Sequence, residues 1–124
     1  MAIRTVATPR LGRRYTDAGT QPTGATMPTY LTLVNWTQQG IENVTNSPAR
    51  LDDAKDVAAD HGGEFVDFYM TFGDYDLVAV TEFPDDESYA RFALTIGRGG
   101  NVSTETLKAF PEEEYRDLIA ALSD

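Results

Sequence analysis

Stretches rich in β-branched and aromatic residues alternate with turn-forming residues along the chain and predict four strands. We expect these strands at residues 29–36, 64–71, 75–83 and 101–109. Gly73 and Asp74 separate the second and third strands. Glycine and aspartate tolerate the positive φ that a short hairpin needs, so this tight turn fixes the register of the two strands that it joins.

Apolar residues recur at helical spacing in three other segments. A helical turn is expected at 41–44, and a helix follows in which Ser47 is the N-cap and Pro48 takes the first helical position. The other two helices begin at Pro84 and Pro111. The apolar positions of the three helices are Leu51, Ala54, Val57, Ala58 and His61, then Tyr89, Phe92, Ala93 and Ile96, then Tyr115, Leu118, Ile119 and Leu122.

The elements follow in the order strand, helix, strand, strand, helix, strand, with one more helix at the end. This order predicts the α+β class and a ferredoxin-like βαββαβ fold, in which helices cover one face of a four-stranded antiparallel sheet. The second and third strands carry large apolar residues on both faces, whereas a solvated face should be polar. Strict alternation places Val66, Phe68 and Met70 on one face of the second strand, and Val78 and Val80 share a face of the third.

Something must therefore cover the second face of the sheet. A second copy of the same sheet is the simplest cover, because an isologous contact needs no other gene product. We expect a homodimer that forms through the sheet face.

Charge divides the chain into two parts. Residues 1–26 carry a net charge of +3, few apolar residues and several turn formers, so we expect a disordered basic arm and consider Met27 a candidate initiator. A transit peptide is the competing interpretation of this arm. Residues 27–124 form the single folded domain, with six basic and nineteen acidic residues. Such an acid excess repels nucleic acid and anionic lipid, and it fits a halophilic source as well as an ordinary acidic protein.

Composition excludes several kinds of site. The chain has no cysteine, which excludes disulfides, thiolate metal sites and cysteine nucleophiles. His61 is the single histidine, so clusters of histidine ligands are excluded as well. We expect neither a metal nor a cofactor. No apolar run approaches the ~20 residues of a membrane span and no signal peptide is apparent, so a cytoplasmic protein without membrane contact is expected.

Short motifs along the chain support a family resemblance. Gly73, Asp74, Tyr75 and Asp76 give the pattern Gly-x-Tyr-Asp. The surrounding motifs are Met27-Pro28-Thr29-Tyr30, Asn46-Ser47-Pro48, Gly62-Gly63, Pro84-Asp85-Asp86 and residues 101–110. In these features residues 27–122 resemble the GYD domain family of the dimeric α/β-barrel superfamily. The resemblance implies the fold and a dimer. The superfamily includes cofactor-independent monooxygenases, lactone isomerases and haem-dependent enzymes, and the fold does not select among them.

Four residues are candidates for catalysis. Tyr75 and Asp76 could act as a pair, although Asp76 satisfying turn amides and Tyr75 packing against the helices would explain the same pattern. Glu105 shares its strand face with apolar neighbours, and burial would favour proton transfer there, whereas a salt bridge at the rim is the alternative. His61 could be a general base, but its place at a helix end also suits a bond to helix carbonyls.

Aromatic and amide side chains are candidates for ligand binding. Asn35, Trp36, Tyr69 and Tyr89 could line a pocket between helices and sheet that takes a hydrophobic or aromatic molecule, with Tyr75 near it. Core packing would explain the same residues.

Two functions follow from these observations. The first is a homodimeric small-molecule-binding or accessory module. The second is a cofactor-independent oxygenase or isomerase that acts on a hydrophobic or aromatic substrate, since such an enzyme needs only a positioned base and a dry pocket. A dimer that binds metal through its many acids is a more distant alternative.

Overall fold

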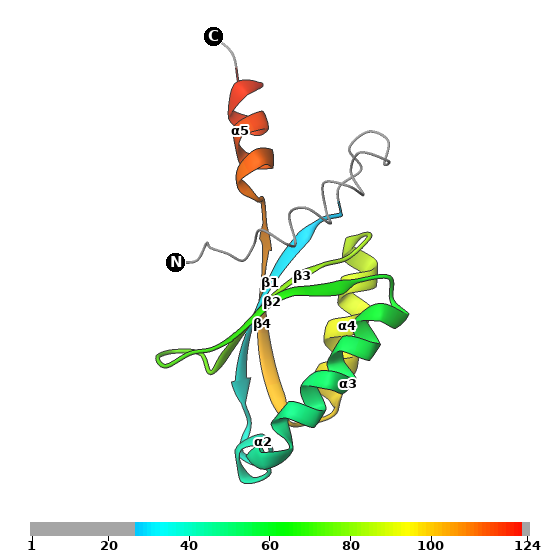
Figure 1. Cartoon of the computed structure of the whole chain (residues 1–124), viewed down its shortest axis with the longest axis vertical. Coiled ribbons are helices and arrows are strands. Elements are labelled where there is room, and N and C mark those ends of the chain that lie inside the picture. The colour runs from blue at the N-terminus through cyan, green and yellow to red at the C-terminus, as the bar shows by residue number, and fades with distance from the viewer. Residues whose placement is uncertain (1–26, 123–124) are drawn as a thin grey trace.

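A four-stranded antiparallel sheet with two long helices on one face forms the centre of the computed structural model, which describes residues 27–122 (Figure 1). The expected basic arm at 1–26 lies outside the described residues. The strands are β1 (Thr29–Trp36), β2 (Glu64–Met70), β3 (Leu77–Glu82) and β4 (Val102–Ala109). Their spatial order is β2-β3-β1-β4, so the central strands are β1 and β3. The α+β class and the ferredoxin-like order of elements are confirmed.

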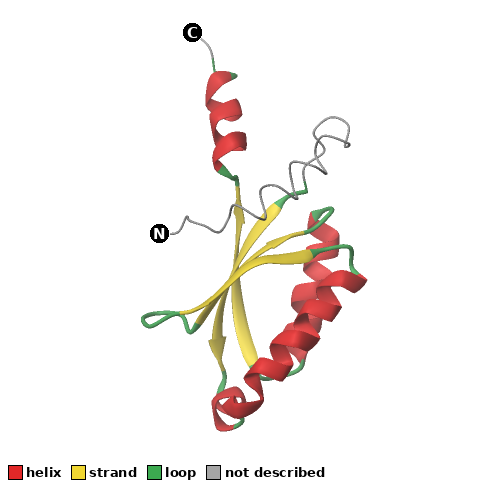
Figure 2. Cartoon of the chain, viewed as in Figure 1, coloured by secondary structure: helices red, strands yellow, loops and turns green. Residues whose placement is uncertain are grey.

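The helices are α2 (Gln38–Glu42), the 3-10 turn η2 (Val44–Asn46), α3 (Ser47–Asp60), α4 (Asp86–Arg98) and α5 (Glu112–Ala120). Helices α3 and α4 cover the same face of the sheet (Figure 2). The helical turn expected at 41–44 is displaced, because Thr37 already caps a helix: its Oγ1 accepts a hydrogen bond from the Gly40 amide at 3.1 Å. Gly40 is buried there, and a Cβ at this position would lie 2.0 Å from the Asn101 carbonyl oxygen.

The start of α3 corrects a second expectation. Asn46, not Ser47, occupies the N-cap position, and no side chain bonds the free amides of the first turn. Ser47 is the first helical residue, and Pro48 still lies in the first turn, where its missing amide costs nothing. In α4, by contrast, the Asp85 carboxylate accepts a hydrogen bond from the Ser88 amide at 2.8 Å.

Aromatic side chains fill the space between α3, α4 and the sheet. Tyr30 of β1 stacks on Tyr89 of α4 with ring centroids 4.3 Å apart, and Phe83 and Phe92 pack against Tyr89 at 5.3 and 5.8 Å. Ala58 of α3 completes this core. The helix positions expected to face inward in α4, from Tyr89 to Ile96, do so.

The register of β2 differs from strict alternation. An irregularity between Phe65 and Asp67 shifts the pairing with β3, so that Phe65, Phe68 and Met70 lie opposite Thr81, Ala79 and Leu77. Directly opposed residues of paired strands point to the same face. Phe68 and Met70 therefore lie on the helix-covered face with Ala79, whereas Val78 and Val80 lie on the second face, so these two sets of apolar residues do not share a face.

We call the second face of the sheet the open face. Its strand residues, assigned from the pairing register, include Leu31, Leu33, Asp67, Tyr69, Val78, Val80, Glu105 and Leu107. No helix covers this face in Figure 1, where α5 extends away from the sheet. None of the residues of α5 is buried, and Tyr115, Leu118 and Ile119 are exposed. Among residues 27–122, nothing thus covers the apolar side chains of the open face and of α5.

Candidate functional site

The turn between β2 and β3 projects beyond the sheet (Figure 2). Gly73 has a φ of +130°, and no atom lies within 4 Å of the place where its Cβ would be. The strand ends are joined below the turn, where the Thr71 amide donates to the Asp76 carbonyl oxygen at 2.8 Å. Phe72 at the tip is 96% exposed. The glycine is required here by the backbone conformation and not by a neighbouring group.

Asp76 ties this hairpin to the end of β1. Its carboxylate accepts a hydrogen bond from the Trp36 amide at 3.0 Å, and its own amide donates to the Val34 carbonyl oxygen at 2.9 Å and to the Asn35 side-chain oxygen at 3.1 Å. These contacts satisfy backbone groups where the ladder between β1 and β3 stops. The Asp76 carboxylate thus has a structural role, but its partner is the Trp36 amide of β1 and not, as the sequence suggests, an amide of the turn.

Tyr75 and Glu105 form a second contact of this region. The Tyr75 hydroxyl donates a hydrogen bond to the Glu105 carboxylate at 2.5 Å. This bond raises the pKa of the Tyr75 phenol above its usual value, because it favours the protonated form. Glu105 is exposed within one chain and makes no salt bridge with Arg91, which pairs instead with Glu87. Burial of Glu105 is not found in the single chain.

His61 lies just after α3, and strand β2 separates it from the hairpin. Its Nδ1 is 2.9 Å from the Val57 carbonyl oxygen, and its backbone amide bonds the Ala58 carbonyl oxygen at 3.0 Å. Both contacts satisfy carbonyl groups at the helix end.

The five expected ligand-binding residues do not line one pocket. Trp36 and Tyr89 lie on the helix-covered side, whereas the register places Asn35 and Tyr69 on the open face. Tyr89 is buried, and its hydroxyl bonds those of Thr32 and Thr106, each at 2.8 Å. The alternation of side chains along β1 separates Asn35 from Trp36.

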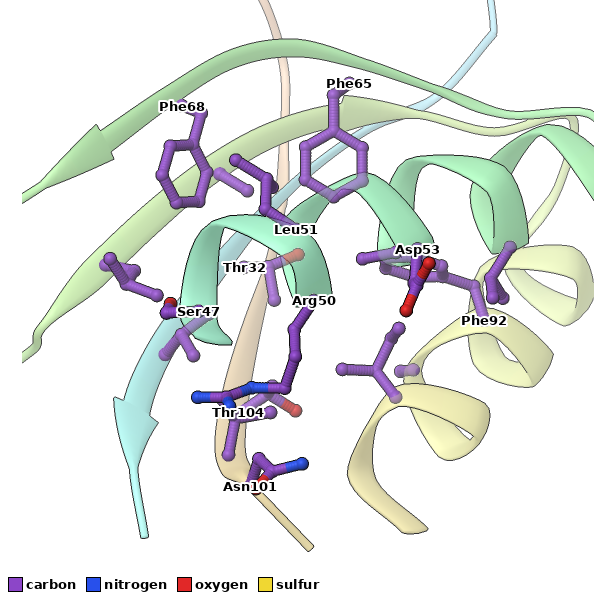
Figure 3. Close-up of a pocket in the computed structure, with 18 of the residues that line it drawn as sticks. Thr32, Ser47, Arg50, Leu51, Asp53, Phe65, Phe68, Phe92, Asn101 and Thr104 are labelled. Carbon is purple, nitrogen blue, oxygen red and sulfur yellow. The ribbon is translucent and has the colours of Figure 1, made fainter. Parts of the chain in front are cut away.

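A cavity of about 280 Å³ lies between the sheet and helices α3 and α4. Figure 3 shows Phe65 and Phe68 of β2 at one end of it, with Leu51 between, and Arg50, Thr104 and Asn101 toward the other end. The remaining walls are mostly apolar, and they include Val34, Trp36, Leu77, Val57, Ala54 and Ile96. Of the predicted ligand-binding residues, Trp36 alone lines this cavity, and none of the four catalytic candidates does.

Several polar groups around the cavity already have partners. The Arg50 guanidinium donates to the carbonyl oxygens of Asn43 and Gly40 at 3.0 and 3.3 Å, and the Thr95 hydroxyl donates to the Arg91 carbonyl oxygen at 2.7 Å. Trp36 Nε1 is different, since this atom is buried and has no hydrogen-bond partner. Within residues 27–122, Thr29 Oγ1 is the one other such side-chain atom, and it does not line the cavity.

A polar cluster closes the opposite end of the helix-covered face. The Tyr30 hydroxyl donates to the Asp86 carboxylate at 2.5 Å, and Lys108 Nζ lies 2.9 Å from the same carboxylate. Burial and the bond to Asp86 raise the pKa of Tyr30, and the bonds from Tyr30 and Lys108 lower the pKa of Asp86. The sequence gives no signal for this cluster, because its members come from a strand, a helix start and another strand.

Residues 27–122 hold neither a group of potential metal ligands nor a helix that could cross a membrane. No three side chains among His, Asp and Glu gather there in an arrangement that could hold a metal ion. The described helices are also too short or too polar for any of them to cross a membrane.

Comparison with known proteins gives two matches. Residues 30–119 match the family model of the GYD domain. The chain is also 36% identical over 97 residues to the "Glutamine synthetase and cystathionine beta-lyase binding protein" of Thermus thermophilus, a match that covers 77% of this chain and 99% of that protein. The GYD domain match spans the four strands from Tyr30 onward, helices α3 and α4, and the hairpin described above.

Proposed function

The chain belongs to the GYD domain family, and on that premise we propose that it is a homodimeric binding module. The observation that carries the proposal is the uncovered apolar surface of the open face. Leu31, Leu33 and Val80 lie at its centre, and Leu107 and Tyr69 are each 48% exposed beside them. A patch of this kind on a soluble domain marks a place of association.

A second copy of the chain is the occupant that we propose for the open face. The face is built from all four strands, so two copies can bring together the same apolar centre in an isologous contact. The apolar side of α5 then has a surface of the partner within reach, since the helix extends beyond its own domain. An isologous dimer would shield both features at once.

A charge in the open face tests this proposal. Val78 lies opposite Leu33 and Tyr69, and Val78→Asp should convert a dimer of the wild type into a monomer, because the carboxylate would be desolvated in the contact. Leu94→Asp is the matched control, since Leu94 is 72% exposed on α4 and its substitution should leave the dimer intact. Sedimentation velocity measures both, with circular dichroism to check folding. A wild type that is monomeric at micromolar concentration would contradict the proposal.

An accessory role toward an enzyme is the form of binding that the relative supports. The Thermus thermophilus protein is named for binding glutamine synthetase and cystathionine beta-lyase, and the match covers 99% of that protein. We propose that this chain likewise binds a metabolic enzyme, with glutamine synthetase as the first candidate. Purified glutamine synthetase from the same host should bind the purified chain in isothermal titration calorimetry, and a heat signal equal to the buffer blank would count against it.

The cavity supports a second binding function, toward a small molecule. It is largely apolar and is formed within one protomer, so each copy in a dimer would hold its own ligand. An oxygenase or isomerase would need a base beside the substrate in the same space. Tyr75, Asp76, Glu105 and His61 all lie elsewhere, and Asp53, the carboxylate among the lining residues, is exposed. Binding is therefore the function that we propose for the cavity.

A further inference from the structure

We propose that the cavity binds a neutral, mainly apolar molecule of one or two fused rings, and that Trp36 Nε1 recognises it by donating a hydrogen bond to a carbonyl oxygen. The inference rests on the small-molecule function proposed above and names the ligand class and the residue that selects it.

The unpartnered indole nitrogen is the observation that points to a ligand. Buried polar groups in proteins nearly always have hydrogen-bond partners, and an exception requires an explanation. Trp36 Nε1 is such an exception, and its residue forms part of the cavity wall. An indole N–H can only donate, so the missing group must be an acceptor.

The other polar groups around the cavity favour a neutral ligand. The Thr32 hydroxyl bonds the Tyr89 hydroxyl at 2.8 Å, and the Asn101 side-chain oxygen accepts a hydrogen bond from Gln39 at 3.1 Å. The two guanidinium contacts of Arg50 are made to backbone carbonyl oxygens near α2, and Asp53 is exposed. The two charged side chains of the lining, Arg50 and Asp53, have opposite signs, so the lining carries no net charge to offset the hydration that a charged ligand would lose.

The size and walls of the cavity limit the ligand further. A volume of about 280 Å³ lies just below the range of about 300–1,000 Å³ that small-molecule sites occupy, so the ligand must be small. Phe65, Phe68 and Phe92 line it with flat aromatic surfaces. A compact ring system that carries one carbonyl group fits this description, because it fills apolar space and supplies the single acceptor.

Two probes that differ in one carbonyl group test the inference. The probes are 1-tetralone and tetralin, a bicyclic ketone and the corresponding hydrocarbon. Ligand-observed NMR gives the Kd of each for the wild type and for Trp36→Phe, which keeps an aromatic ring and removes the N–H. We expect the ratio of the Kd for tetralin to the Kd for tetralone to fall about tenfold in the variant, as the loss of one hydrogen bond predicts. Any change in cavity size affects both probes and cancels in the ratio.

Two alanines of α3 provide the matched controls for the place of binding. Ala54 lines the cavity and Ala59 is exposed on the same helix. Ala54→Leu should raise the Kd of both probes at least tenfold by filling the cavity, and Ala59→Leu should leave both unchanged. In addition, Trp36 is the one tryptophan of the chain, so its fluorescence should respond to tetralone in the wild type.

Each of the other possible results contradicts one part of this inference. If both probes bind the wild type and the ratio of their Kd values is the same in Trp36→Phe, the small-molecule function stands and the role of Trp36 is wrong. Binding that survives Ala54→Leu places the site outside the cavity and also overturns the inference. If neither probe binds at millimolar concentration, the ligand class is wrong, while the homodimer is judged separately by sedimentation of Val78→Asp.

Discussion

At the scale of single residues, the family motif separates into parts with different physical roles. Gly73 supplies a backbone conformation, and Asp76 holds the hairpin to β1 through the Trp36 amide. Tyr75 reaches across to Glu105 on β4. The contacts of Asp76 join backbone groups, whereas those of Tyr75 join two side chains near the open face.

This difference gives a prediction for the motif. Asp76→Ala should lower the free energy of unfolding by about 1–3 kcal/mol, because the Trp36 amide loses its charged acceptor. Tyr75→Phe removes a hydroxyl from an exposed pair and should cost less than Asp76→Ala. Urea unfolding measures both variants. If Asp76→Ala keeps full stability and loses tetralone binding, Asp76 would be a functional residue and not a structural one.

At the scale of elements, the caps of the two long helices differ. Asp85 accepts a hydrogen bond from the Ser88 amide at the start of α4, and Asn46 makes no such bond at the start of α3. The bond from the Ser88 amide lowers the pKa of Asp85, with a further bond from the Ser88 side chain. The carboxylate form is therefore the one that stabilises α4.

The capping bond can be measured by substitution. Asp85→Ala should lower the free energy of unfolding at neutral pH because α4 loses its side-chain cap, and Asn46→Ala should change it by less. Because the folded pKa of Asp85 lies below its unfolded value, this contribution is present above the unfolded pKa near 3.8 and is lost as the pH falls through the folded pKa. Urea unfolding at pH 7 and pH 3 measures the difference. Equal effects of the two substitutions would contradict the assigned cap.

The sequence predicts the order of the elements because each one has a local pattern of apolar residues and turn formers. It does not predict the faces of β2, because the irregularity after Phe65 depends on pairing with β3 and has no glycine to mark it. Local sequence patterns do not predict the cavity either, because its size depends on how α3 and α4 lie on the sheet. An aromatic residue at the end of β1 is visible in the sequence, but the missing partner of Trp36 Nε1 appears only in three dimensions.

At the scale of the whole molecule, acidic residues outnumber basic ones in the domain and on the open face. Asp67, Glu82 and Glu105 lie on that face, and none of its strand residues is Lys or Arg. In a homodimer through this face, the acids of the two copies would approach one another. Repulsion of this kind is reduced by salt, with a Debye length of ~3 Å at 1 M.

Salt should therefore stabilise the protein and its dimer. We expect the Tm to rise and the Kd of the dimer to fall as KCl increases from 0.1 to 2 M, because screening reduces the repulsion among nineteen acids and six bases in residues 27–124. Differential scanning calorimetry and sedimentation equilibrium measure the two quantities. A control series in sucrose separates screening from general exclusion of the solute. A Tm that stays flat or falls with KCl would contradict both this expectation and a halophilic source.

The central position of β1 affects how the protein is made in the cell. This strand leaves the ribosome first among the four, yet its two neighbours are β3 and β4, and β4 follows only after α4. At about 5–20 residues per second of synthesis, β1 waits on the order of several seconds with at least one edge open. Nascent chains of this protein therefore present a β-strand edge to chaperones and to other nascent chains until β4 has been translated.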